Sequence, residues 1–119
     1  MGFTTVKVKI CNPRYPERQR EAELLVDTGT VYSIVPGEVL KELRIEPLGK
    51  RTFLLASGAR IEREVGGALY RIGEREGYAS VVFGEKGDKA LLGVTALEEL
   101  GLQVDPVTKE LRPTELLLL

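Results

Sequence analysis

The feature that most constrains the fold of this chain is a succession of short alternating segments, separated by turns rich in glycine, proline and aspartate. Near the N-terminus, Val6, Val8 and Ile10 alternate with Lys7 and Lys9, which is typical of a half-buried strand. Similar segments predict strands over residues 21–26, 31–35, 52–56, 59–65, 68–72, 78–83, 102–104 and 109–112. Many short strands joined by tight turns favour an all-β, mainly antiparallel fold, a small β-barrel.

Turn and cap signals add one hairpin and two short helices to this prediction. Ser57-Gly58 is flanked by two strand-like segments, which is a hairpin pattern. Pro36 opens a helix over residues 37–43, since proline is tolerated in the first helical turn. A second helix follows residue 93, with Thr95 and Glu98 as a predicted capping box and Gly101 as its C-terminal stop.

The composition excludes several kinds of catalytic site. The chain has 119 residues, enough for one domain, and its 43% hydrophobic and 29% charged residues are typical of a soluble globular protein. It contains no histidine, which excludes Ser-His-Asp and Cys-His catalysis. Its single cysteine, Cys11, excludes an intrachain disulfide and disfavours a zinc site. We therefore expect no metal and no other cofactor.

Charge and hydropathy also limit the partners that we expect. The net charge is −1 and the basic residues are scattered, whereas a nucleic-acid-binding surface needs a basic patch. The N-terminal segment carries Lys7 and Lys9 and lacks the apolar stretch of a signal peptide. The leucine run at residues 116–119 is too short to span a membrane. We expect a cytoplasmic protein that binds neither nucleic acid nor membrane.

Asp27 is the aspartate with a catalytic-looking context. The chain has three aspartates, Asp27, Asp88 and Asp105, and Asp27 alone follows an apolar strand and precedes Thr28-Gly29. The same tripeptide also has a purely structural interpretation, because Asp, Thr and Gly are good turn formers after a strand. The tripeptide alone therefore leaves both interpretations open.

Three motifs follow one another along the chain: Val26-Asp27-Thr28-Gly29, Val35-Pro36 and Leu91-Leu92-Gly93 with Leu97. Their order resembles that of the small, single-domain retropepsin-like aspartic proteases of bacteria and archaea. The resemblance covers roughly residues 6–113. It implies a closed acid-protease-type β-barrel in a domain of residues 1–113. It also implies that the tail at 114–119 is a candidate strand at a dimer interface. The leucine run alone is equally compatible with a frayed end or with contact to another partner.

The resemblance implies a role for each residue of these motifs. Asp27 would be the catalytic carboxylate, Thr28 would grip its counterpart across the dimer, and the Gly29 backbone would approach the substrate. Ser57, Gly58 and Ala59 would form the tip of a flap, and Leu91, Leu92 and Gly93 the floor under the active-site loop. In that loop, the Thr30 hydroxyl would either donate to the outer oxygen of Asp27 or merely cap the turn.

The chain departs from the viral members at two positions. Retroviral enzymes commonly have an aspartate where this chain has Val31 and an arginine where it has Val94. The two partners are absent together, so neither charge is left unpaired. The departure argues against a viral protease rather than against the fold.

The function that we expect is an aspartic endopeptidase that hydrolyses peptide bonds with an activated water. The chemistry needs two carboxylates that share one proton, and this chain offers only Asp27, so the second must come from another copy in a two-fold homodimer. The substrate would be an extended peptide or protein segment held between flap and floor. The alternatives are a non-catalytic dimeric module for peptide binding or assembly, and an unrelated β-barrel with a chance motif.

Overall fold

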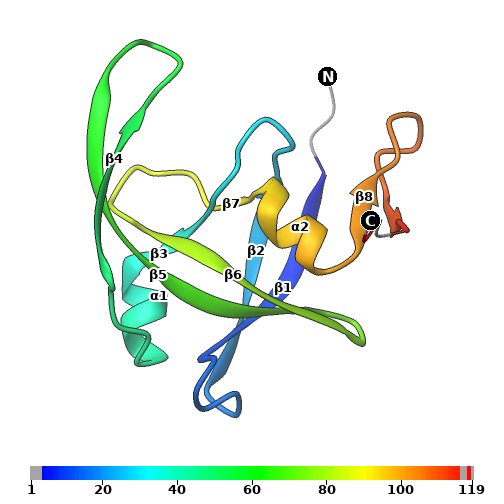
Figure 1. The fold of residues 1–119 in the computed structure, drawn as a ribbon, viewed down its shortest axis with the longest axis horizontal. Coiled ribbons are helices and arrows are strands. Elements are labelled where there is room, and N and C mark those ends of the chain that lie inside the picture. The colour runs from blue at the N-terminus through cyan, green and yellow to red at the C-terminus, as the bar shows by residue number, and fades with distance from the viewer. Residues whose placement is uncertain (1–3, 116–117, 119) are drawn as a thin grey trace.

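The computed structural model describes residues 4–115 and 118, and it contains nine strands and two helices within them (Figure 1). The strands are β1 (Thr5–Cys11), β2 (Gln19–Val26), β3 (Ser33–Pro36), β4 (Gly49–Leu54), β5 (Arg60–Ile72), β6 (Arg75–Gly84), β7 (Leu91–Leu92), β8 (Leu102–Val104) and β9 (Leu111–Pro113). The helices are α1 (Gly37–Glu42) and α2 (Val94–Glu99). No helix of the described chain is long and apolar enough to cross a membrane.

Seven of the strands form one curled sheet in the order β1-β2-β7-β3-β6-β5-β4. Most pairs are antiparallel, whereas β2–β7 and β3–β6 are parallel. β1 also pairs with β5, which brings the sheet round on itself. The predicted mainly β barrel with two short helices is confirmed, but it is not strictly closed. A single residue pair, Ile34 with Leu91, joins β3 to β7, and β4 lies outside the ring.

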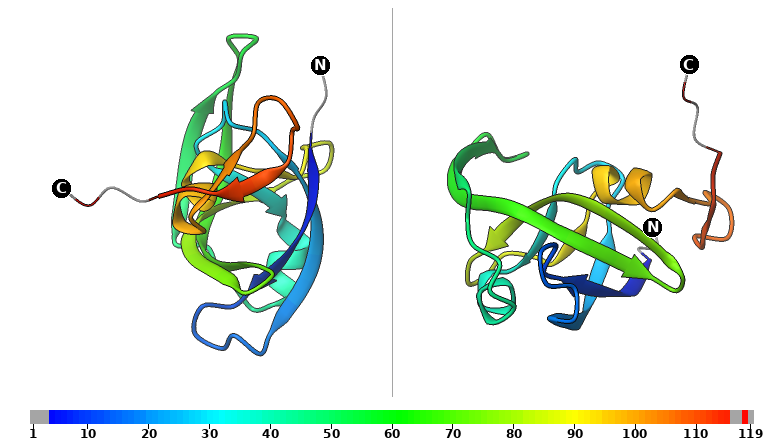
Figure 2. Two further views of the ribbon diagram at one scale, coloured as in Figure 1. Left: turned by 90° about the vertical axis from the view of Figure 1, so that its right-hand side faces the viewer. Right: turned by 60° about the horizontal axis from the view of Figure 1, so that its bottom comes forward.

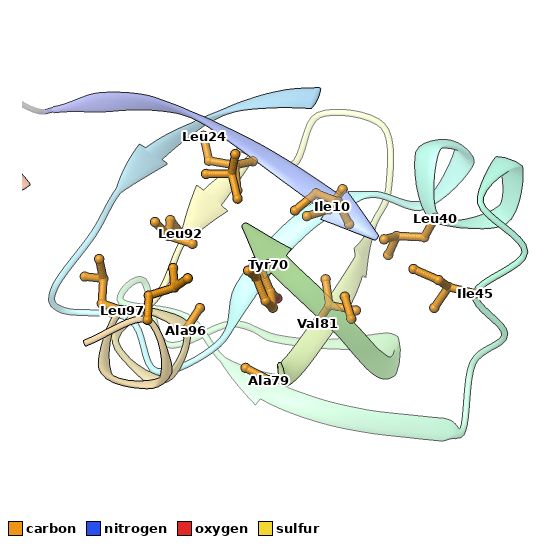
Figure 3. Close-up of a cluster of buried hydrophobic side chains, with 14 of the residues drawn as sticks. Ile10, Leu24, Leu40, Ile45, Tyr70, Ala79, Val81, Leu92, Ala96 and Leu97 are labelled. Carbon is orange, nitrogen blue, oxygen red and sulfur yellow. The ribbon is translucent and has the colours of Figure 1, made fainter. Parts of the chain in front are cut away.

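The core fills the inside of the curled sheet (Figure 3). Val8 and Ile10 are fully buried, while Lys7 and Lys9, which alternate with them, are exposed, as the pattern predicts. Tyr70 is also fully buried, and its hydroxyl donates to the carbonyl oxygen of Ser80 at 2.8 Å. That bond satisfies the one polar atom of this side chain inside an apolar core.

The prediction of separate strands over residues 59–65 and 68–72 is wrong, because β5 runs unbroken from Arg60 to Ile72. Gly66 and Gly67 do not end the strand; they allow close packing. A Cβ on Gly66 would lie 3.0 Å from the carbonyl oxygen of Glu46, and one on Gly67 would lie 2.1 Å from the Tyr78 hydroxyl oxygen. Glycine inside a strand often marks such close approach rather than a turn.

The predicted capping box of the second helix is also wrong. The N-cap of α2 is Gly93, and no side chain caps the helix. Its first N–H groups instead find backbone acceptors, described below with the site. The C-terminal stop is confirmed, because Gly101 has φ of 68° and its N–H donates to the Glu98 carbonyl oxygen at 3.0 Å.

β8 and β9 form a separate two-stranded sheet beside α2, at the C-terminal side of the molecule (Figure 2). The strand predicted over residues 31–35 starts only at Ser33, and that predicted over 109–112 corresponds to Leu111–Pro113. Half of the tail at 114–119, which was predicted as an interface strand, lies outside the described residues, since 116, 117 and 119 are not among them.

Candidate active site

Asp27 is positioned by the strand pair beneath it. It follows directly on β2, whose last residues Leu25 and Val26 pair in parallel with Leu91 and Leu92 of β7. The Asp27 N–H donates to the Leu92 carbonyl oxygen at 3.0 Å, which extends this pairing by one residue. The turn then closes, because the Thr30 N–H donates to the Asp27 carbonyl oxygen at 3.3 Å. The backbone of Asp27 is therefore fixed by the sheet.

The Asp27 carboxylate is half-buried and oriented by its own loop. Oδ1 accepts the Gly29 N–H at 2.9 Å, and Oδ2 accepts the Thr30 hydroxyl at 3.0 Å. A Cβ at position 29 would lie 3.3 Å from Oδ1, so a side chain there would crowd the carboxylate. Thr28 and Gly29 are exposed at the tip of the turn. The loop thus presents an oriented carboxylate at the surface.

Leu92 and Gly93 pack directly under this loop. Leu92 is fully buried, and the Gly93 N–H donates to the buried Ser33 hydroxyl at 2.9 Å. A Cβ on Gly93 would lie 2.6 Å from the carbonyl carbon and oxygen of Tyr32. The backbone of the outgoing loop therefore passes too close for any other residue at position 93. Leu91 is half-buried beside them in β7.

The N-terminus of α2 holds the far side of the loop, an arrangement that sequence reasoning missed. The Val94 N–H donates to the Thr30 carbonyl oxygen at 2.8 Å, and the Thr95 N–H donates to the Val31 carbonyl oxygen at 3.1 Å. The first N–H groups of a helix have no partner within it, so they need acceptors from elsewhere. That requirement was the available signal, but the sequence does not say which carbonyls meet it.

The candidate flap is the turn between β4 and β5. Leu55 N–H donates to the Ala59 carbonyl oxygen at 2.8 Å, and Gly58 N–H donates to the Leu55 carbonyl oxygen at 2.9 Å. Gly58 has φ of 90°, and Ser57, Gly58 and Ala59 are all exposed. This turn and the loop after β2 lie at the same end of the molecule (Figures 1 and 2). Among the described residues, no hydrogen bond joins the turn to Asp27.

The outgoing limb of the active-site loop contacts the β4 arm through side chains that sequence reasoning did not single out. The ring of Tyr32 meets that of Phe53 edge-on, with 5.4 Å between their centroids. The Arg51 guanidinium lies 5.7 Å from the centroid of the Tyr32 ring and also donates to the Tyr32 hydroxyl. No local sequence pattern predicts these contacts, because they depend on which face of β4 is directed toward the loop.

A second missed interaction ties the β5 arm to the turn that leads into β7. Arg63 donates to both carboxylate oxygens of Asp88, at 2.7 and 3.0 Å. The side chains are only 15% and 19% exposed. The hydrogen bond from Arg63 is the main cause that holds the pKa of Asp88 below its usual value. Among the described residues, no group of three or more His, Cys, Asp or Glu side chains is arranged to hold a metal ion.

Several solved structures are similar to this chain, and two proteases are among them. A protease of simian foamy virus (mac) matches with a TM-score of 0.54 and 16% identity, over 80% of this chain and 92% of that one. A retropepsin-like aspartic protease from Rickettsia conorii matches with a TM-score of 0.57 and 21% identity, over 87% of this chain and 77% of that one. No protein-family model and no curated protein matches the sequence. The chain therefore has the retropepsin-like fold.

Proposed function

We propose that this protein is an aspartic endopeptidase that acts as a symmetric homodimer. The observation that carries the proposal is the Asp27 carboxylate, half-buried and oriented by two hydrogen bonds in an exposed turn. It lies in a fold that two proteases share, one of them an aspartic protease by name. Likeness of fold does not establish function, so the site itself has to support the chemistry.

The other aspartates of the chain are engaged elsewhere. Asp88 is paired with Arg63, and Asp105 accepts the N–H groups of Val107 and Thr108 and pairs with Arg112. Neither is free to share a proton with Asp27. The second carboxylate must therefore come from Asp27 of a second copy, with the site on the two-fold axis.

The two carboxylates divide the work of hydrolysis. Like charges about 3 Å apart do not both ionise readily, so the pair shares one proton. The ionised Asp27 removes a proton from water, and the water oxygen attacks the carbonyl carbon of the scissile bond. The protonated partner donates to the carbonyl oxygen, and the tetrahedral intermediate then collapses. The C–N bond breaks as the nitrogen takes up a proton, so one water has been added across the peptide bond.

The remaining motif residues support this reaction in the proposed dimer. Thr28 contacts its counterpart across the axis, while the exposed Gly29 backbone faces the substrate. Ser57, Gly58 and Ala59 cover an extended peptide from above. Val31, which is 61% exposed beside the catalytic turn, is available for the dimer interface. We place the tail at 114–119 in that interface, and the enzyme in the cytoplasm, on the sequence argument alone.

The test compares wild type with Asp27→Asn and a matched control, Glu23→Gln. Glu23 is exposed on the same strand, so its variant makes the same carboxylate-to-amide change outside the site. Wild type and Glu23→Gln should cleave a pooled peptide library between pH 3 and 8, read by mass spectrometry. Asp27→Asn should cleave nothing, and all three should sediment as dimers.

Each contrary result has a definite meaning. Cleavage by Asp27→Asn would remove Asp27 from the mechanism. A strict monomer at every concentration would contradict the shared-proton chemistry. A wild type that binds peptides as a dimer and cleaves none of them would favour the non-catalytic peptide-binding module instead.

A further inference from the structure

A small pocket lies where the active-site loop meets the flap arm. It has a volume of about 210 Å³ and is lined by Tyr32, the first half of β4 with Leu48, and facing residues of β5 and β6. This is smaller than the roughly 300–1,000 Å³ of typical small-molecule sites, so its size suits a single side chain.

The charge of this pocket is positive and unbalanced. Its lining residues include Lys50 and Arg51 but no carboxylate. Lys50 has an acidic neighbour, because its Nζ lies 3.9 Å from Glu62. Arg51 forms no ion pair within the described chain, and its hydrogen-bond partner there is the neutral Tyr32 hydroxyl. A negative group of the right size would find an uncompensated guanidinium in this pocket.

The Arg51 side chain is already ordered in a position where it can bind such a negative group. Its guanidinium lies over the Tyr32 ring at 5.7 Å and donates to the hydroxyl of the same residue. These contacts restrict the long side chain and leave most of its five N–H donors free. A planar guanidinium matches the two oxygens of a carboxylate, and ordering it beforehand reduces the entropy lost on binding.

The pocket lies within reach of a peptide that extends away from Asp27. Arg51 and Phe53 lie on one face of β4, and both contact Tyr32, so this face of the flap arm is directed at the active-site loop. Tyr32 follows Asp27 by five residues, a separation of at most roughly 17 Å. A substrate strand rises about 3.3 Å per residue, so a side chain within about five residues of the cleaved bond reaches the pocket.

We propose that this pocket takes a glutamate side chain of the substrate and that Arg51 is the residue that selects it. The inference rests on the proposed peptidase function and adds a substrate class to it. The carboxylate would pair with Arg51, and the two methylenes would cover Leu48, which is 81% exposed at the pocket rim. Burial of that apolar surface favours glutamate over the shorter aspartate.

The test uses octapeptide libraries in which each position is fixed in turn as Glu or as its isostere Gln. Binding is measured by fluorescence polarisation on Asp27→Asn, and cleavage is measured separately on wild type. At one position, Glu should improve binding and kcat/KM by about tenfold, the ratio expected for a charge-assisted, partly exposed hydrogen-bonded pair.

Two variants assign the preference to Arg51. Arg51→Glu should reverse it, so that Lys is favoured at the same position. Arg18→Glu makes the same change of net charge in the exposed β1–β2 turn, at the bottom of the molecule in Figure 1 and outside the pocket lining, and should leave it intact. Thermal melts should be alike for the two variants, because both arginines are exposed.

The outcomes separate this inference from the proposed function. Cleavage with no preference for Glu at any position would overturn the pocket and leave the peptidase standing. A Glu preference in binding, with no cleavage by wild type, would leave the pocket standing and overturn the peptidase. A preference that survives Arg51→Glu, or a pool in which nothing binds, would overturn the assignment of Arg51.

Discussion

The Arg63–Asp88 ion pair should stabilise the fold measurably, and Asp88→Asn is the change that tests it. The asparagine keeps the shape of the side chain, but it removes the negative charge and replaces one acceptor oxygen with an NH2 donor. Of the two hydrogen bonds from Arg63, at 2.7 and 3.0 Å, only one can then remain. Among the described residues, Arg63 would keep Glu85 as its ion-pair partner, 3.5 Å away and with 65% of its side chain exposed. The guanidinium, itself only 15% exposed, would then lie largely withdrawn from water without a close counter-charge.

The expected loss of unfolding free energy is about 2 kcal/mol, the usual scale for hydrogen bonds to charged groups and below that for a fully buried pair. For a domain of this size, such a loss lowers Tm by about 5–10 °C. The Asp88 carboxylate also accepts the Glu85 N–H at 2.7 Å, which an amide oxygen continues to do. The predicted loss therefore belongs to the ion pair rather than to the turn.

The effect should depend on pH in a defined direction. The pKa of Asp88 lies below its ordinary value of 3.8, first because of the hydrogen bond from Arg63. A carboxyl whose pKa is lower in the folded than in the unfolded state stabilises the fold fully above its unfolded pKa. That contribution is lost as the pH falls through the folded-state pKa. The gap between wild type and Asp88→Asn should be constant near neutrality and should narrow below about pH 4.

The assay is urea denaturation at one fixed protein concentration, because dimerisation would make stability depend on concentration. A double-mutant cycle of Asp88→Asn with Arg63→Gln isolates the coupling. The matched control is the same cycle on Arg20 and Glu42, a pair whose side chains are 50% and 61% exposed and whose coupling should be much smaller. A coupling no larger than the control, or a stability gap unchanged at pH 3, would refute the reasoning.

Three further predictions concern the site and the flap. Gly93→Ala should cost about 3 kcal/mol or more by overpacking against Tyr32, whereas Gly49→Ala, with open space around its Cβ, should melt like wild type. Thr30→Ala should lower kcat/KM about tenfold with the dimer intact, and Thr30→Ser should restore it; equal activity of both would leave Thr30 a mere turn residue. The backbone amides of residues 55–59 should exchange their hydrogens faster than those of 21–26, and their exchange should slow when a statine peptide is bound. Slow exchange in both states would show that the hairpin is rigid.

Much of the fold was predictable because its signals are local. The alternation of Val8 and Ile10 with lysines specifies a strand with one buried face, and Gly101 specifies the end of α2 through its positive φ. Asp27 could be singled out for the same reason, since it follows directly on an apolar strand. Such local signals fail where tertiary packing requires a residue for another reason. Gly66, in the middle of β5, allows close packing instead of forming a turn.

The sequence by itself determined the places of most strands and turns, the catalytic-looking tripeptide and the absence of histidine chemistry, but not the continuity of β5. Only the tertiary structure decided that α2 begins on the carbonyls of Thr30 and Val31, and that Arg63 meets Asp88 across 25 residues of chain. It also decided that Arg51 faces Tyr32 rather than solvent alone. The physical reason is that strand register and close backbone approach select these partners. Neither can be predicted from residues that are adjacent in the sequence.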